Sequence, residues 1–119
     1  MAAPAKSAKL IHLRYEVTGK VQGVFFRKCT KDQADKLRLV GWVQNTMRKT
    51  VIGEIQGNKL QITSMKQWLK EDSSKIASGK GSLINVKDVK FEERDIEKCT
   101  FDQFIVDRQG IYKDFSLIV

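Results

Sequence analysis

The sequence predicts an α+β domain in which two helices cover one face of a mostly antiparallel sheet. Apolar and polar residues alternate over residues 11–18, as in a strand with one buried face. Helical spacing follows over residues 26–37, and two further strand-like runs, 40–46 and 50–56, flank a short turn. A chain of 119 residues has the length of one compact domain, so these elements are expected to share one core.

The first half of the chain gives the clearest pattern. The apolar face of the first strand comprises Ile11, Leu13, Tyr15 and Val17, and its polar face His12, Arg14, Glu16 and Thr18. On this polar face, His12 is expected to be a surface residue. A loop with two glycines covers residues 19–25, and a helix of about three turns begins at Phe26. The strands 40–46 and 50–56 form a hairpin, and Trp42 is expected to pack in the interior.

In the second half, Gly57 and Asn58 predict a strand end followed by a helix cap. A second helix is expected over residues 59–71, with Trp68 on its packed face, and a Ser/Gly/Lys-rich linker over Asp72–Ser82. Residues 84–92 predict a fourth strand. Alternation of Phe115, Leu117 and Val119 predicts an extra strand at the C-terminus, whereas residues 93–109 show no assignable pattern.

The resulting order, βαββαβ with a terminal strand, is that of a ferredoxin-like fold with two helices on one face of the sheet. Residues 1–9 are rich in Ala, Lys and Ser and have no apolar core segment, so they are expected to form a flexible tail and not a secretion signal. The folded domain is therefore predicted to span residues 10–119.

Composition narrows the possible functions. The chain has 22 Lys and Arg against 14 Asp and Glu, a net charge of +8, which favours an anionic partner. Two cysteines, Cys29 and Cys99, and one histidine are too few for a disulfide framework or a four-ligand zinc site. We expect free thiols, with Cys29 buried and Cys99 more exposed, a cytoplasmic location, no metal and no membrane association.

The loop between the first strand and the first helix is the candidate anion site. Residues 17–31 contain no acidic residue but four cations, namely Lys20, Arg27, Lys28 and Lys31. Glycines at 19 and 23 allow positive φ, so that successive N–H groups turn inward beside a helix start. Nucleotide-binding fingerprints are missing from the loop, and the P-loop-like run at 78–82 lacks Ser or Thr after its lysine.

Two segments of the chain closely resemble the signatures of the acylphosphatase family. They are Gly19-Lys20-Val21-Gln22-Gly23-Val24-Phe25-Phe26-Arg27 and Gly41-Trp42-Val43-Gln44-Asn45-Thr46. The similarity covers about residues 10–91, and residues 112–119 resemble the closing strand of the family. The resemblance implies hydrolysis of an acyl phosphate to a carboxylate and inorganic phosphate.

The resemblance also implies roles for individual residues. The backbone amides of Gln22, Gly23, Val24, Phe25 and Phe26 would cradle the phosphate, which Arg27 would clamp, and Asn45 would orient the attacking water. Gly19 and Thr46 would support the loop. Arginine suits this role because its planar fork matches two phosphate oxygens. No general acid is needed for a carboxylate leaving group, and the water proton would pass to the substrate phosphate. The implied enzyme is a cofactor-free monomer inhibited competitively by inorganic phosphate.

Two alternatives remain open from the sequence. A basic nucleic-acid-binding module would have the same βαββαβ order, although residues 50–56 offer no aromatic side chain on which a base could stack. A relative that binds acyl phosphates without turnover would be expected to lack Arg27 or Asn45, and both are present.

Overall fold

The computed structural model describes residues 9–23, 25–72 and 84–118, and its five strands form one sheet in the order β4-β1-β3-β2-β5. The central strand β1 (Leu10–Lys20) pairs antiparallel with β3 (Val51–Asn58) on one side and with β4 (Asn85–Ile96) on the other. The strand β2 (Val40–Asn45) completes the hairpin with β3 and pairs in parallel with β5 (Phe104–Val106). The ferredoxin-like fold with an extra strand is confirmed.

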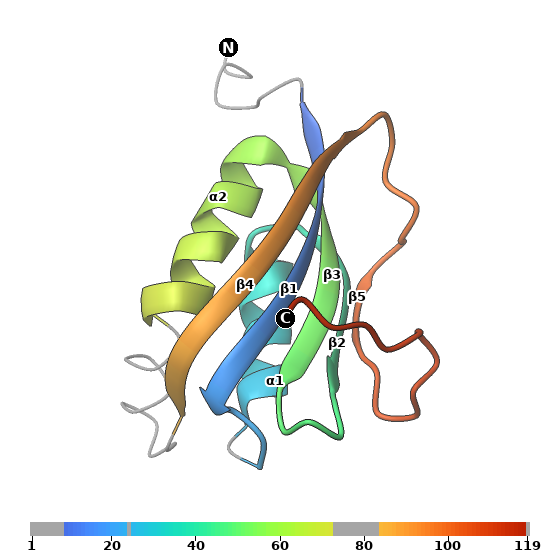
Figure 1. Ribbon diagram of the computed structural model, residues 1–119. Helices are drawn as coiled ribbons and strands as arrows, with labels where there is room; N and C mark the ends of the chain where they lie inside the picture. Colours follow the sequence, from blue (N-terminus) through green and yellow to red (C-terminus); the bar gives the residue numbers. More distant parts are fainter. Residues whose placement is uncertain (1–8, 24, 73–83, 119) are drawn as a thin grey trace.

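Two helices pack on one face of this sheet (Figure 1). Helix α1 (Phe26–Lys36) begins at the expected residue, and α2 (Lys59–Gln67) begins after Asn58, whose side chain accepts a hydrogen bond from the Leu60 N–H as a helix cap. The second helix ends earlier than expected and continues as a single π-helical segment, η2 (Trp68–Asp72). Most of the expected linker and tail, residues 73–82 and 1–8, lies outside the described residues.

The main core lies between the sheet and the helices. It joins the apolar face of β1 to residues from both helices and from β2, β3 and β5. Its largest members include Ile11, Leu13, Tyr15, Phe26, Ile55, Ile62, Met65 and Phe104. Trp68 packs in this core beside Phe26, with ring centroids 6.2 Å apart, which confirms its packing role.

The predicted strand at residues 115–119 is wrong for the part of it that is described. The fifth strand is instead Phe104–Val106, within the stretch that showed no assignable pattern, and residues 112–118 form no strand. The C-terminal extension, which we define as residues 107–118, crosses the sheet face opposite the helices (Figure 1). Its alternation has a physical cause: Phe115 and Leu117 lean on that face, whereas Ser116 and Ile118 are more exposed.

The expectation that His12 is a surface residue is also wrong, because Phe101 lies against its ring with centroids 6.3 Å apart. His12 is 5% exposed, with Nε2 2.6 Å from a Glu54 carboxylate oxygen and Nδ1 2.8 Å from the Gln56 side chain. Trp42 is buried on the same face and stacks on Tyr112 at 4.9 Å between centroids, so its interior packing is confirmed. Cys29 and Cys99 are both free and half-buried, although burial of Cys29 and greater exposure of Cys99 were expected.

Candidate active site

The loop between β1 and α1 has an unusual backbone. Gly19, Gly23 and Phe25 all have positive φ, at 124°, 73° and 63°. Gly19 lies at a bulge against β4, where a Cβ would collide with the backbone of Asn85 and Lys87, so this position requires glycine. Phe25 has a side chain and yet adopts the left-handed conformation, a strained arrangement that is concentrated at functional sites.

The start of α1 leaves backbone donors unpaired within the helix. The residue at its N-cap, Phe25, makes no side-chain capping bond, and the first turn contains no acidic residue. The amide of Cys29 makes the first turn's bond to the Phe25 carbonyl at 3.0 Å, so the N–H groups before it have no intrahelical acceptor. A left-handed residue followed by a helix start directs successive N–H groups into a concavity suited to an anion.

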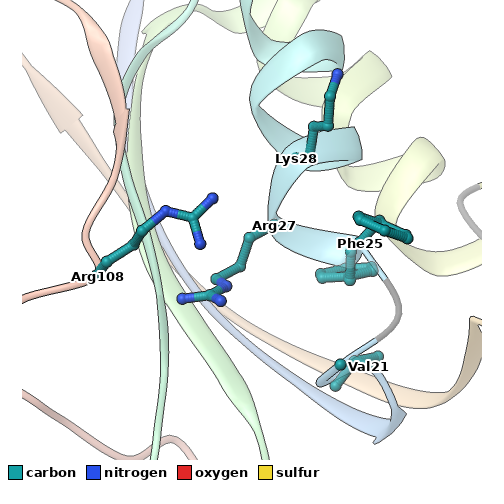
Figure 2. Close-up of a pocket in the computed structure, with 7 residues that line it drawn as sticks. Val21, Phe25, Arg27, Lys28 and Arg108 are labelled. Atoms are coloured by element: carbon teal, nitrogen blue, oxygen red, sulfur yellow. The ribbon is translucent and has the colours of Figure 1, made fainter.

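A cavity of about 250 Å³ opens at this helix start (Figure 2). It is lined by Val21, Gly23, Phe25, Phe26, Arg27, Lys28 and Arg108. None of these lining residues is acidic. The pKa of Arg27 is lowered, first by its burial and then by the positive charge of Arg108. The cavity therefore holds positive charge that the surrounding described residues do not neutralise.

The structure gathers only part of the predicted site around this cavity. Gly23, Phe25, Phe26 and Arg27 line it, Gln22 and Asn45 do not, and Val24 lies outside the described residues. The Gln22 side chain instead turns to the β2–β3 hairpin.

Hydrogen bonds connect the loop to the hairpin that carries Asn45. Nε2 of Gln22 donates to the backbone carbonyls of Thr46 at 2.9 Å and Thr50 at 2.8 Å. Thr46 closes the hairpin turn, because its hydroxyl accepts from the Arg48 and Thr50 amides and lies 2.7 Å from the Thr50 hydroxyl. The loop and the end of β2 are therefore held as one unit.

Asn45 is the last residue of β2, next to the carbonyl that Gln22 contacts. Its side-chain oxygen is buried and has no hydrogen-bond partner among the described residues. Such an unpaired buried acceptor costs about 1–3 kcal/mol, and in native proteins it calls for an explanation such as a bound ligand or water.

Sequence reasoning missed Arg108. It follows β5 by two residues and lies 81 positions after Arg27. No local motif marks it, because its place beside Arg27 depends on the parallel pairing of β5 with β2.

The described residues contain neither a cluster of metal ligands nor a helix that could span a membrane. In residues 9–23, 25–72 and 84–118, no group of three or more His, Cys, Asp or Glu side chains is arranged to hold a metal ion. Within the same ranges, no helix has both the length and the apolar character of a membrane span.

Comparison with known proteins decides the family. The acylphosphatase family model matches residues 13–106. The chain belongs to the acylphosphatase family. It is therefore a hydrolase, and the general reaction of an acylphosphatase is the hydrolysis of acyl phosphates.

Several relatives support this assignment. Acylphosphatase-2 of Xenopus tropicalis is 43% identical over 105 residues, which cover 87% of this chain and 96% of the relative. Acylphosphatase-1 of Mus musculus is 51% identical over 70 residues, 59% of this chain and 71% of the relative. The structure of an acylphosphatase from Coxiella burnetii superimposes with a TM-score of 0.63 at 29% identity, covering 89% of this chain and 99% of that one.

The acylphosphatase family match ends at residue 106, the last residue of β5. The C-terminal extension and its Arg108 therefore lie beyond the part of the chain that the family model matches.

Proposed function

We propose that this acylphosphatase holds the phosphoryl group of its substrate with Arg27 and the backbone amides of residues 22–26, and that Asn45 orients the attacking water. The observation that carries the proposal is the acid-free cavity at the start of α1, which Arg27 lines together with Gly23 and Phe25 of the loop. Phosphoryl transfer depends mainly on positioning and on stabilising negative charge, and a guanidinium with amide donors supplies both.

The proposed reaction is a single displacement at phosphorus. The water oxygen bonds to phosphorus, the bond from phosphorus to the acyl oxygen breaks, and the carboxylate leaves with the electron pair. The proton of the water passes to a phosphoryl oxygen of the substrate, since an amide such as Asn45 is no useful base near neutral pH. The products are a carboxylate and inorganic phosphate, and the latter competes with substrate for Arg27.

Asn45 would be joined to this reaction through the hairpin. Gln22 binds the carbonyl of Thr46, so the phosphate loop and Asn45 keep a fixed relation. The unpaired Asn45 side-chain oxygen supports a role in accepting a hydrogen bond from a ligand or a water. Thr46 and Gly19 act as supports, through the hairpin turn and through the bulge against β4.

Further parts of the proposal concern the state of the enzyme. We propose that it works as a cytoplasmic monomer without a cofactor and without nucleic acid. The sheet face on which a βαββαβ nucleic-acid module would stack bases carries Trp42 beneath Tyr112 of the C-terminal extension. This cover is the observation that disfavours the nucleic-acid alternative.

The test compares phosphate release from benzoyl phosphate, with EDTA present, in the wild type, Arg27→Gln and Asn45→Ala. Arg27→Gln should lower kcat by about 10³-fold or more and weaken inhibition by inorganic phosphate, by analogy with arginine contacts in phosphoryl transfer. Asn45→Ala should lose turnover but keep phosphate inhibition, because a water-orienting group contributes little to ground-state binding.

A matched control is Lys36→Gln, which removes the same charge from the exposed C-terminal end of α1. It should change neither kcat nor the inhibition constant of inorganic phosphate by more than about two-fold, since an exposed charge at the far end of the helix is screened. An Asn45→Ala variant that keeps turnover and loses phosphate inhibition would contradict the assigned roles. Release of phosphate from p-nitrophenyl phosphate at a comparable rate would contradict the substrate class.

A further inference from the structure

The first residue of the C-terminal extension fixes the chain beside the cavity. Asp107 is 2% exposed, and its backbone N–H donates to the Val43 carbonyl at 2.8 Å. Its carboxylate accepts from the backbone amides of Ile111 and Tyr112, both at 2.9 Å, and from the Gln44 side chain at 2.6 Å. The residue that follows is therefore presented from an anchored turn and not from a loose end.

That next residue, Arg108, extends into the cavity that Arg27 also lines. Figure 2 shows both side chains extending into the same part of the cavity, Arg27 from α1 and Arg108 from the chain after β5. Lys28 also lines the cavity, but it points away from both and pairs with Asp32 at 3.1 Å.

Neither guanidinium has an acidic partner among the described residues. The ion pairs formed in this part of the chain include neither Arg27 nor Arg108. Two like charges in one cavity repel each other, and the charge of Arg108 is the second cause, after burial, of the lowered pKa of Arg27. An anion between the two groups would offset their repulsion and would accept charge-assisted hydrogen bonds from both guanidinium groups.

We propose that Arg108 is a second phosphate ligand of this enzyme, which binds oxygens of the substrate phosphoryl group from the side opposite Arg27. The inference rests on the proposed function, because it assumes that the cavity is the phosphate site. It extends that function: a dianion held between two guanidinium groups is favoured over a monoanion, and the C-terminal extension becomes part of the active site.

The experiment measures the binding and inhibition constants of inorganic phosphate for Arg108→Gln, Arg108→Lys and the control Lys113→Gln. The control removes the same charge from an exposed position of the same extension, away from the cavity lining. Binding is followed by the rise of the thermal unfolding midpoint with phosphate concentration, at constant ionic strength and with EDTA. Inhibition and kcat/KM are measured with benzoyl phosphate.

We expect Arg108→Gln to weaken phosphate binding and inhibition by about 10-fold or more, the range for a hydrogen bond to a charged group. Its kcat/KM should fall to a similar degree, Arg108→Lys should recover part of the loss, and Lys113→Gln should resemble the wild type. Phosphate binding in Arg108→Gln that equals that of Lys113→Gln would overturn the inference. So would a fall of kcat/KM in Arg108→Gln with unchanged binding and inhibition by inorganic phosphate.

The thermal measurement separates this inference from the proposed function. If Arg27→Gln abolishes turnover while Arg108→Gln behaves like Lys113→Gln, only the inference fails. If the wild type releases no phosphate from benzoyl phosphate but binds inorganic phosphate through both arginines, the proposed reaction fails and Arg108 remains a phosphate ligand.

Discussion

Arg48 and Arg27 both lie near the C-terminal extension, yet their guanidinium groups have opposite surroundings. Arg48, in the β2–β3 turn, donates to the Glu16 carboxylate at 3.1 Å, to Asp114 at 3.0 Å and to the Phe115 carbonyl at 2.6 Å. Its pKa is raised, first by the hydrogen bond to Asp114. Arg27 meets another arginine instead, and its pKa is lowered.

The difference separates an arginine that is paired within the fold from one that, in the proposed function, binds phosphate. At Arg48 the extension supplies a carboxylate and a carbonyl, so the charge is satisfied within the fold. At Arg27 the extension supplies Arg108, which adds charge where the fold offers no described counterion. Like charges held together without a described counterion repel each other, and a bound anion would offset that repulsion.

Replacing Glu16 by alanine removes a carboxylate that pairs with Arg48, and it should have the largest effect on the free energy of unfolding. The Glu16 side chain is 0% exposed and accepts hydrogen bonds from Arg48, from the Thr50 hydroxyl at 2.7 Å and from the Leu117 amide at 2.7 Å. Without this carboxylate the Thr50 and Leu117 donors lose their acceptor, at about 1–3 kcal/mol each or about 2–6 kcal/mol together, whereas the half-exposed Arg48 keeps Asp114. Glu16→Ala should lower the free energy of unfolding in urea by that amount.

Two controls accompany this measurement. Glu92→Ala removes an exposed carboxylate 3.8 Å from Arg14 and should cost less than about 1 kcal/mol. Arg27→Gln should change the free energy of unfolding by about 0.5 kcal/mol or less, because it breaks no ion pair with a described residue. A similar loss in Glu16→Ala and Arg27→Gln would mean that the two arginines do not differ in kind.

Much of this fold could be predicted because β1 has one apolar and one polar face in the sequence. Residues 11–18 alternate because one face packs on the helices, and Asn58 marks the start of α2 because a helix N-cap prefers such a side chain. The short strand β5 could not be predicted, since three residues, Phe104–Val106, are too few to show a period. Alternation at residues 115–118 indicated a strand, but it reflects one-sided packing of a segment without ladder pairing.

The candidate site divides in the same way. Gly23, Phe25 and Arg27 belong to one continuous segment, so the sequence predicts that they act together. Arg108 comes from another strand end and is placed by the packing of β5 beside β2. His12 was misjudged for a related reason, because the segment that covers its face follows it by more than 80 residues.

Acid should destabilise the fold where the Asp107 and Glu16 carboxylates hold the C-terminal extension. Burial opposes ionisation of Asp107, but hydrogen bonds from the Tyr112 and Ile111 amides and from Gln44 outweigh it and lower the pKa. Burial likewise opposes ionisation of Glu16, and bonds from Thr50, the Leu117 amide, Arg48 and Ser116 lower its pKa. A lowered folded-state pKa gives stability that is present above the unfolded value, near 4, and is lost as pH falls through the folded value.

The free energy of unfolding should therefore stay level from about pH 8 to 5 and fall below about pH 4, by up to about 1.4 kcal/mol per pH unit for each group. Asp107→Asn should flatten this slope in urea unfolding measured between pH 2 and 6. Asp102→Asn, at an exposed position, is the matched control and should keep the wild-type slope. Equal slopes in both variants would show that the Asp107 bonds add nothing to stability.

The smallest expected effect is that of ionic strength on kcat/KM, which tests whether the charge at Arg27 is available to a substrate. In the proposed site Arg27 and Arg108 would attract a charged substrate through solvent, so kcat/KM for benzoyl phosphate should fall by about two- to five-fold between 20 and 200 mM ionic strength. Arg108→Gln should reduce this dependence more than Lys113→Gln does, although both variants lose one positive charge. The two should instead respond alike if capture depends on the net charge of +8 alone. A difference between them would place the attraction in the cavity, where the same fold that neutralises Arg48 leaves two guanidinium groups open to an anion.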